Sequence, residues 1–249
     1  MTMEPYQLQQ LRIRRFSTNV YLALVCFGMP LIFTRFYFNI TETKHIFFLT
    51  CSLVYALALV LIAILFPAGY GVAKPERKPV APAIWLLIAF FGCLVLGGVL
   101  GGHPEDAFFG QNNRYQGILT TFTYSVVVFA LSRQTLNLRF AEAATAAGAA
   151  LVGALGLLNH YGVDPFGFMT KLTEFDRGRF LSTIGNADFY GSYFSLAFPV
   201  TLGLFLHAER KLTRVLSAFA LVFASFGALV AGSDSTALGM IAAAVVFPL

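Results

Sequence analysis

Long apolar runs recur along most of this chain of 249 residues. A helix needs a run of about 20 apolar residues to cross the hydrocarbon core of a membrane. Hydrophobic residues make up 57% of the chain and charged residues 12%, with a mean hydropathy of +0.73, whereas a soluble domain carries about 25% charged residues. The runs lack the alternation of transmembrane barrel strands. The sequence therefore predicts an all-α membrane protein, a polytopic helix bundle forming one domain over residues 1–249.

The lengths and polarity of these runs predict seven complete transmembrane spans. The predicted spans cover about 20–38, 45–66, 82–102, 117–132, 140–158, 187–206 and 215–231. An eighth apolar run begins at Thr236 and has only about 14 residues, fewer than a crossing requires. We therefore expect the natural protein to continue beyond this sequence.

The basic residues are distributed unevenly between the two sets of loops. One set, which includes the N-terminal segment, carries 11 of the 17 Lys and Arg residues, and the other carries 6. Because basic residues near span ends are retained in the cytoplasm, the N-terminus is predicted to be cytoplasmic. This distribution accounts for the basic isoelectric point, so no nucleic-acid partner is expected.

Three arginines fall in loops predicted to lie on the external side of the membrane, opposite the cytoplasm. Arg114 lies in the stretch 101–117, and Arg177 and Arg179 lie ahead of the span at 187–206. A guanidinium group binds a phosphate ester through two parallel hydrogen bonds, so an anionic ligand is one interpretation. Arginines at this depth also serve as anchors at the level of the lipid headgroups, which is the alternative.

The segment STIGNAD, residues 182–188, leads into the span at 187–206. Gly185 lets the backbone approach a ligand closely, and the positive end of the helix dipole faces outward at this point. A helix N-terminus beside two arginines is suited to binding an anion. Asp188 is interpreted either as a residue that stabilises the helix N-terminus or as a catalytic base.

Four segments together resemble the O-antigen ligase and O-antigen polymerase superfamily of membrane glycosyltransferases. They are FFGQNNRYQGILT at 108–120, YGVDPFG at 161–167, RFLSTIGNADFYGSYFSLAFP at 179–199 and GSDSTALGM at 232–240. The order and spacing of the segments are similar to those of the family. The chain departs from the family pattern at three positions. The family often has Asn or Pro where Ala187 and Asp188 stand, and Arg where Asp234 stands.

The resemblance implies a C-type glycosyltransferase fold and a reaction without a metal or other cofactor. The donor would be a glycan on an undecaprenyl-diphosphate carrier at the outer face of the bacterial plasma membrane, and the acceptor a hydroxyl group of a lipid or glycan. Inverting transfer expels a lipid diphosphate, whose developing charge arginines stabilise. The residues implied are, for catalysis, Arg179, Arg177 and Asp188, and for binding the diphosphate and glycan, Arg114, Tyr115, Asn186, Gly185 and Ser182.

Two other functions remain open from the sequence. A transporter or flippase for a polyprenyl-linked glycan or another anionic lipid would also direct arginines toward a cavity. Such a protein is expected to show broken helices in paired internal repeats, and no repeat is evident here. A structural or sensor subunit of the membrane would need no arginine cluster.

Overall fold

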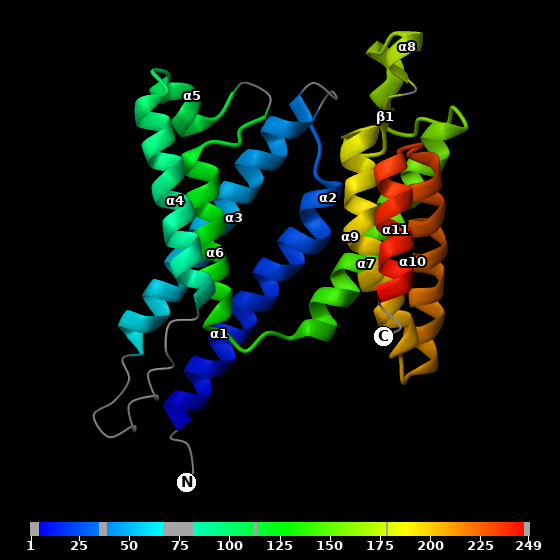
Figure 1. The fold of residues 1–249 in the computed structure, drawn as a ribbon. Helices are drawn as coiled ribbons and strands as arrows, with labels where there is room; N and C mark the ends of the chain where they lie inside the picture. The colour runs from blue at the N-terminus through cyan, green and yellow to red at the C-terminus, as the bar shows by residue number, and fades with distance from the viewer. Residues whose placement is uncertain (1–4, 35–38, 67–81, 112–113, 178, 247–249) are drawn as a thin grey trace. The chain divides into compact units, whose positions relative to one another are not determined.

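The computed structural model describes residues 5–34, 39–66, 82–111, 114–177 and 179–246 (Figure 1). Over these residues the chain is helical, apart from loops and one pair of two-residue strands. The chain forms two compact units, each described separately below. The first unit comprises Met1–Tyr21 and His45–Leu136, and the second comprises Leu22–Lys44 and Asn137–Leu249.

In the first unit, α1 (Pro5–Ala23) is joined to α3 (Ile40–Leu65) by buried polar contacts. The hydroxyl groups of Thr18 and Tyr55 lie 3.1 Å apart, within hydrogen-bond distance. The rings of Tyr21 and Tyr55 stack with their centroids 4.5 Å apart. Polar side chains inside an apolar environment are tolerated when they bond to each other, so these pairs set the register between the two helices.

Three further helices complete the first unit: α4 (Pro82–Leu100), α5 (Pro104–Phe109) and α6 (Ile118–Ser132). The aromatic rings of Phe91 and Phe122 pack α4 against α6, with their centroids 5.6 Å apart. The short α5 helix lies beside both at one end, and it leads into the loop that carries Arg114.

The helix that begins as α1 continues through a π-helical turn and ends a few residues later. A π-helical segment, η1 (Leu24–Gly28), is followed by α2 (Met29–Leu31). Ile32 leaves the helix with an extended backbone. Single π-helical turns inside α-helices are frequent at functional positions.

Four helices form the body of the second unit: α7 (Leu138–His160), α9 (Ala187–Leu206), α10 (Lys211–Val230) and α11 (Asp234–Val246). They pack side by side, with α9 in contact with each of the other three (Figure 1). Small residues at the contacts let the backbones approach closely, as the Ala and Gly content of α7 predicts.

The core of this bundle is built around two aromatic residues of α9. The side chains of Tyr190 and Phe194 are fully buried. Gly156 of α7 and Gly227 of α10 leave the room that the Tyr190 ring occupies, since a Cβ at either position would meet its hydroxyl group.

Between α7 and α9 the chain forms a small folded cap. It contains a 3-10 turn η3 (Phe168–Lys171), α8 (Glu174–Arg177) and two antiparallel strands, β1 (Phe180–Leu181) and β2 (Gly185–Asn186). The buried side chain of Phe168 packs with Ile40 and other apolar residues beneath the cap. The cap is therefore an ordered extension of the second unit.

The structure confirms an all-α protein with helices suited to a membrane, and it corrects the number of spans. In the described residues, four helices are long and apolar enough to cross a membrane, namely α3, α7, α9 and α10. They correspond to the spans predicted at 45–66, 140–158, 187–206 and 215–231. The prediction of seven complete spans is wrong.

The other three predicted spans fail for different reasons. The stretch of α4 whose side chains the structure describes, Ile84–Leu100, and the whole of α6, Ile118–Ser132, are shorter than a span requires. The span predicted at 20–38 is not a single helix, because the helix leaves its regular path at Ile32, and positions 35–38 lie outside the described residues. The helix α11 begins two residues before the predicted eighth run.

Candidate functional site

A tight turn links the two strands of the cap, and it has an unusual backbone. Ser182 has a φ of +55°, and Gly185 has a φ of +90°. Glycine adopts such angles without steric cost, whereas serine does not. Ser182 is also fully buried, and its hydroxyl group has no hydrogen-bond partner in the described residues. Its conformation is therefore imposed by the surrounding structure.

Two buried side chains impose that conformation. The Oδ1 atom of Asn159, at the end of α7, accepts a hydrogen bond of 2.9 Å from the backbone N–H of Ser182. The Nδ2 atom of Asn159 donates to the carbonyl of Val163 at 3.1 Å. The hydroxyl group of Thr183 donates to the carbonyl of Pro30 at 2.7 Å. The turn is therefore bonded to both α7 and α2, far away in sequence.

Some of the backbone N–H groups at the N-terminus of α9 already form hydrogen bonds within the protein. Asn186 is its N-cap, and its Oδ1 accepts a hydrogen bond of 2.7 Å from the N–H of Asp188. The N–H of Ala187 donates to the carbonyl of Arg179 at 2.8 Å. Two of the four donors that a helix leaves unpaired are thus occupied. Asp188 itself is exposed and adds negative charge to the first turn, which disfavours an anion bound by the helix terminus alone.

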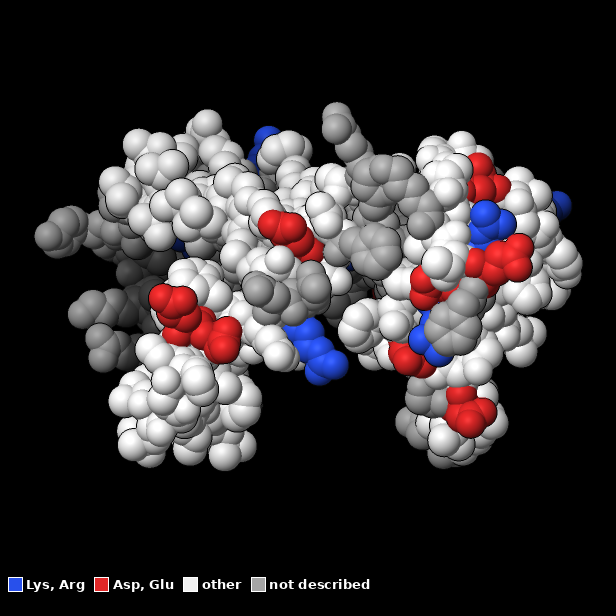
Figure 2. All heavy atoms as spheres, turned by 90° about the horizontal axis from the view of Figure 1, so that it is seen from above, with Lys and Arg blue, Asp and Glu red and all other residues white. Residues whose placement is uncertain are grey.

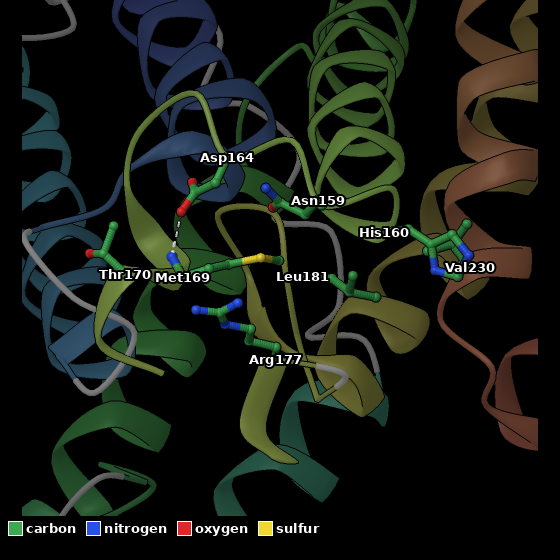
Figure 3. A pocket seen from close by; sticks show the side chains of 9 residues that line it. Asn159, His160, Asp164, Met169, Thr170, Arg177, Leu181 and Val230 are labelled. Carbon is green, nitrogen blue, oxygen red and sulfur yellow. Dashed lines mark hydrogen bonds between the residues drawn. The ribbon is translucent and has the colours of Figure 1, made fainter. Parts of the chain in front are cut away.

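A cavity of about 440 Å³ opens in the cap of the second unit (Figure 3). Its lining includes Asn159, His160, Asp164, Met169 and Arg177. The side chain of Arg177 extends from the end of α8 toward Met169, as the close-up shows. Because Asn159 also anchors Ser182, the cavity and the strained turn share one wall.

The charges in this cavity differ in their availability. Both carboxylate oxygens of Asp164 accept hydrogen bonds from backbone N–H groups, those of Phe168 and Met169. Asp164 therefore serves to start the 3-10 turn. Arg177 and His160 are exposed and are the other ionisable side chains in the lining. The cavity therefore offers Arg177 and His160 to a ligand, beside the hydrogen-bonded carboxylate of Asp164.

Arg179 lies on the turn between α8 and β1 and is also exposed. Its backbone N–H donates to the carbonyl of Asp176 at 2.9 Å. The exposed acidic side chains Glu174 and Asp188 belong to the same end of the unit. Figure 2 shows acidic side chains gathered around the basic ones on this face. The arginines therefore act in a surrounding of mixed charge, which weakens long-range attraction for anions but leaves direct contacts intact.

The loop that carries Arg114 belongs to the first unit and is built by a second strained residue. Tyr115 has a φ of +51°, and its ring stacks on His45 of α3 with centroids 5.0 Å apart. The Oγ1 atom of Thr120 donates to the carbonyl of Tyr115 at 2.6 Å. Gly117 lets this loop close on itself, since a Cβ there would meet the carbonyl of Phe108. Arg114 is exposed beside this fixed tyrosine.

The structure brings most of the residues predicted from sequence together within the second unit. Those in the cap and at the start of α9 are Arg177, Arg179, Ser182, Gly185, Asn186 and Asp188. Arg114 and Tyr115 belong to the first unit. A cavity shared by all three arginines stays a prediction.

Two predicted binding residues, Ser182 and Gly185, are buried and shape the turn. Their role in binding a ligand stays a prediction. Sequence reasoning missed Asn159 and Thr183, which anchor the turn, and His45, which supports Tyr115. Asn159 gave a weak signal, as a lone amide at the end of an apolar helix.

No group of three metal-ligating side chains occurs in the part of the chain that the structure describes. Comparison of the chain with protein-family models, curated proteins and solved structures finds no match. The site is therefore interpreted from its own residues and from the resemblance in its motifs.

Proposed function

We propose that this protein is a membrane glycosyltransferase of the O-antigen ligase type. It transfers a glycan from an undecaprenyl-diphosphate carrier to a hydroxyl group of a lipid or glycan acceptor, at the outer face of the bacterial plasma membrane. In this proposal Arg177 and Arg179 bind the diphosphate, Arg114 and Tyr115 bind the donor, and Asp188 is the candidate base for the acceptor hydroxyl.

The observation that carries the proposal is the position of the strained backbone. Among the described residues, Tyr115 and Ser182 are the two non-glycine residues with positive φ. Both lie inside the segments that resemble the glycosyltransferase family. Residues held in such conformations cost about 1 to 3 kcal/mol each and cluster at functional sites. An exposed arginine adjoins Tyr115, and two precede Ser182 closely, so the rigid turns hold cations near the surface.

The chemistry of the arginines supports the same function. When the anomeric bond breaks, the leaving lipid diphosphate gains negative charge, and fixed guanidinium groups stabilise that charge. A hydrogen bond to a charged group contributes about 1.5 to 3 kcal/mol. Because the first turn of α9 is partly occupied by Asn186 and Arg179, the side chains of the arginines carry most of this role.

Replacement of each arginine tests the proposal directly. The substitutions Arg114→Ala, Arg177→Ala and Arg179→Ala are expected to lower transfer by about tenfold to a hundredfold each, at about 1.4 kcal/mol per factor of ten. Arg179→Lys is expected to restore part of the activity, because lysine keeps the charge without the paired geometry. The assay follows a labelled undecaprenyl-diphosphate glycan into the acceptor, in membranes that contain the full chain at matched abundance.

Arg139 supplies the matched control. It is an exposed arginine at the other end of α7, and its guanidinium group pairs with Glu209 at 3.2 Å. Arg139→Ala should leave transfer unchanged, since exposed ion pairs contribute little. Normal transfer and normal carrier binding in all three test variants would show that these arginines are interfacial anchors. Movement of the carrier across the membrane without any transfer would instead favour a transporter.

A further inference from the structure

A second cavity, of about 430 Å³, lies within the second unit. We call it the lateral groove. The 22–31 helical segment, α7 and α9 contribute its walls, and nearly all of its lining is apolar.

The lateral groove extends along α9. Tyr193, Leu196 and Val200 line it on successive turns and cover about 10 Å of helix axis, at 1.5 Å per residue. Ile184, just before α9, and Lys44 also line the groove. An apolar groove that follows the helix in this way can take one hydrocarbon chain that lies parallel to the helix.

Among the described residues, Lys44 is the one charged residue in the lining of the groove. Its ammonium group donates to the carbonyls of Met29, Pro30 and Ile32, at 2.6, 3.0 and 3.1 Å. These carbonyls end the 22–31 helical segment, where the helix dipole supplies a negative charge of about one half. No carboxylate of the described residues forms an ion pair with Lys44. The three carbonyls use all three N–H groups of the ammonium, so an anion at this position would interact with Lys44 through its charge.

We propose that the lateral groove binds one acyl chain of an anionic phospholipid, with the phosphate group beside Lys44. The apolar walls take up the chain, and the phosphodiester supplies a counter-ion. A singly charged phosphodiester matches the single, partly compensated charge of Lys44. A diphosphate is better matched by the arginines of the cap. This site is independent of the proposed transfer reaction.

Binding of defined lipids to the delipidated full chain tests the proposal. Native mass spectrometry would compare phosphatidylglycerol with phosphatidylcholine of identical acyl chains. One basic residue near a membrane surface contributes about 1 kcal/mol toward an anionic lipid, so we expect about fivefold tighter binding of phosphatidylglycerol. The substitution Lys44→Gln should remove this preference, and Lys44→Arg should retain part of it. Equal affinity of the wild-type protein for both lipids would overturn the proposal.

A second variant tests the groove without altering Lys44. Val200→Trp fills the groove and should lower phosphatidylglycerol binding at least about tenfold, the effect of losing about 1.4 kcal/mol. Phe189→Trp provides the control, because Phe189 is an exposed residue of the same helix outside the groove lining. Unchanged binding by the Val200 variant would contradict the proposal. Displacement of phosphatidylglycerol by a lower concentration of undecaprenyl phosphate would also contradict it and assign the groove to a polyprenyl chain.

Discussion

At the scale of the residue, Ser182 shows how a costly conformation is maintained. Its backbone lies in the left-handed region and its hydroxyl group is buried without a partner among the described residues. The hydrogen bond from its N–H to Asn159 and the bond from Thr183 to Pro30 offset that cost. Such an arrangement fixes the direction in which the chain leaves β1 and enters α9.

Two substitutions at Ser182 separate backbone strain from the loss of the hydroxyl group. Both Ser182→Gly and Ser182→Ala remove the hydroxyl, but only glycine adopts a φ of +55° without steric cost. We therefore expect the glycine variant to be more stable than the alanine variant by about 1 kcal/mol. Thermal unfolding of the purified protein in detergent measures the difference. An alanine variant of equal or greater stability would show that this backbone is not left-handed.

At the scale of the element, the bundle of the second unit depends on glycine at its helix contacts. A Cβ at Gly191 of α9 would meet the hydroxyl group of Thr236 on α11. A Cβ at Gly153 of α7 would meet the carbonyl of Phe223 on α10. Close contacts between backbones stabilise helices in a membrane, where lipid removes most of the hydrophobic driving force.

Alanine in place of glycine ordinarily stabilises a helix, but at these contacts we expect it to lower the stability of the bundle. Gly156→Ala places a methyl group against the buried Tyr190 hydroxyl, so we expect a loss of about 1 to 3 kcal/mol through overpacking. Gly97→Ala in α4 is the control, because nothing lies within 4 Å of the added Cβ. That control should be neutral or more stable by up to about 1 kcal/mol. Thermal unfolding of both variants tests the contrast, and equal melting temperatures would refute it.

At the scale of the whole molecule, the basic residues predict one orientation in the membrane. The set of loops with 11 Lys and Arg residues is predicted to be cytoplasmic, together with the N-terminus. Arg114 and Arg177 are then outside, where a lipid-linked donor and its acceptor would be available. This orientation follows from the sequence-based spans. The four long apolar helices alone would leave α7 as the one crossing between Arg114 and Arg177, which puts them on opposite sides. The proposed function therefore requires a further crossing in the chain between Arg114 and Arg177.

Cysteine labelling tests the orientation. In a background without the native cysteines, Glu76→Cys and Asn112→Cys place thiols on either side of α4 in the sequence. The sequence-based spans predict them on opposite sides of the membrane, whereas the four long apolar helices alone would leave both on one side. An impermeant maleimide applied to intact spheroplasts should label position 112, and it should label position 76 only after permeabilisation. The reverse pattern would invert the protein and place the arginines of the cap in the cytoplasm.

The sequence by itself determined the class of the protein and several of its helices. Runs of apolar residues long enough to span a membrane identify α3, α7, α9 and α10, because length and hydropathy are local properties. The N-terminus of α9 was also predictable, since Asn186 is a favoured N-cap residue. Residues of the candidate site were recognisable as polar groups in loops, although their contacts were not.

Only the tertiary structure decided where the first helix stops and how the turn at Ser182 is held. The helix ends at Leu31, where Lys44 and Thr183 bond to its last carbonyls, although apolar sequence continues to Phe33. Asn159 holds the N–H of Ser182, 23 residues further along the chain. The periodicity of apolar residues in a sequence indicates which face of a helix is buried. It does not indicate these hydrogen bonds, because their partners are separated by irregular lengths of sequence. The bonds form only because packing of the helices brings their ends together.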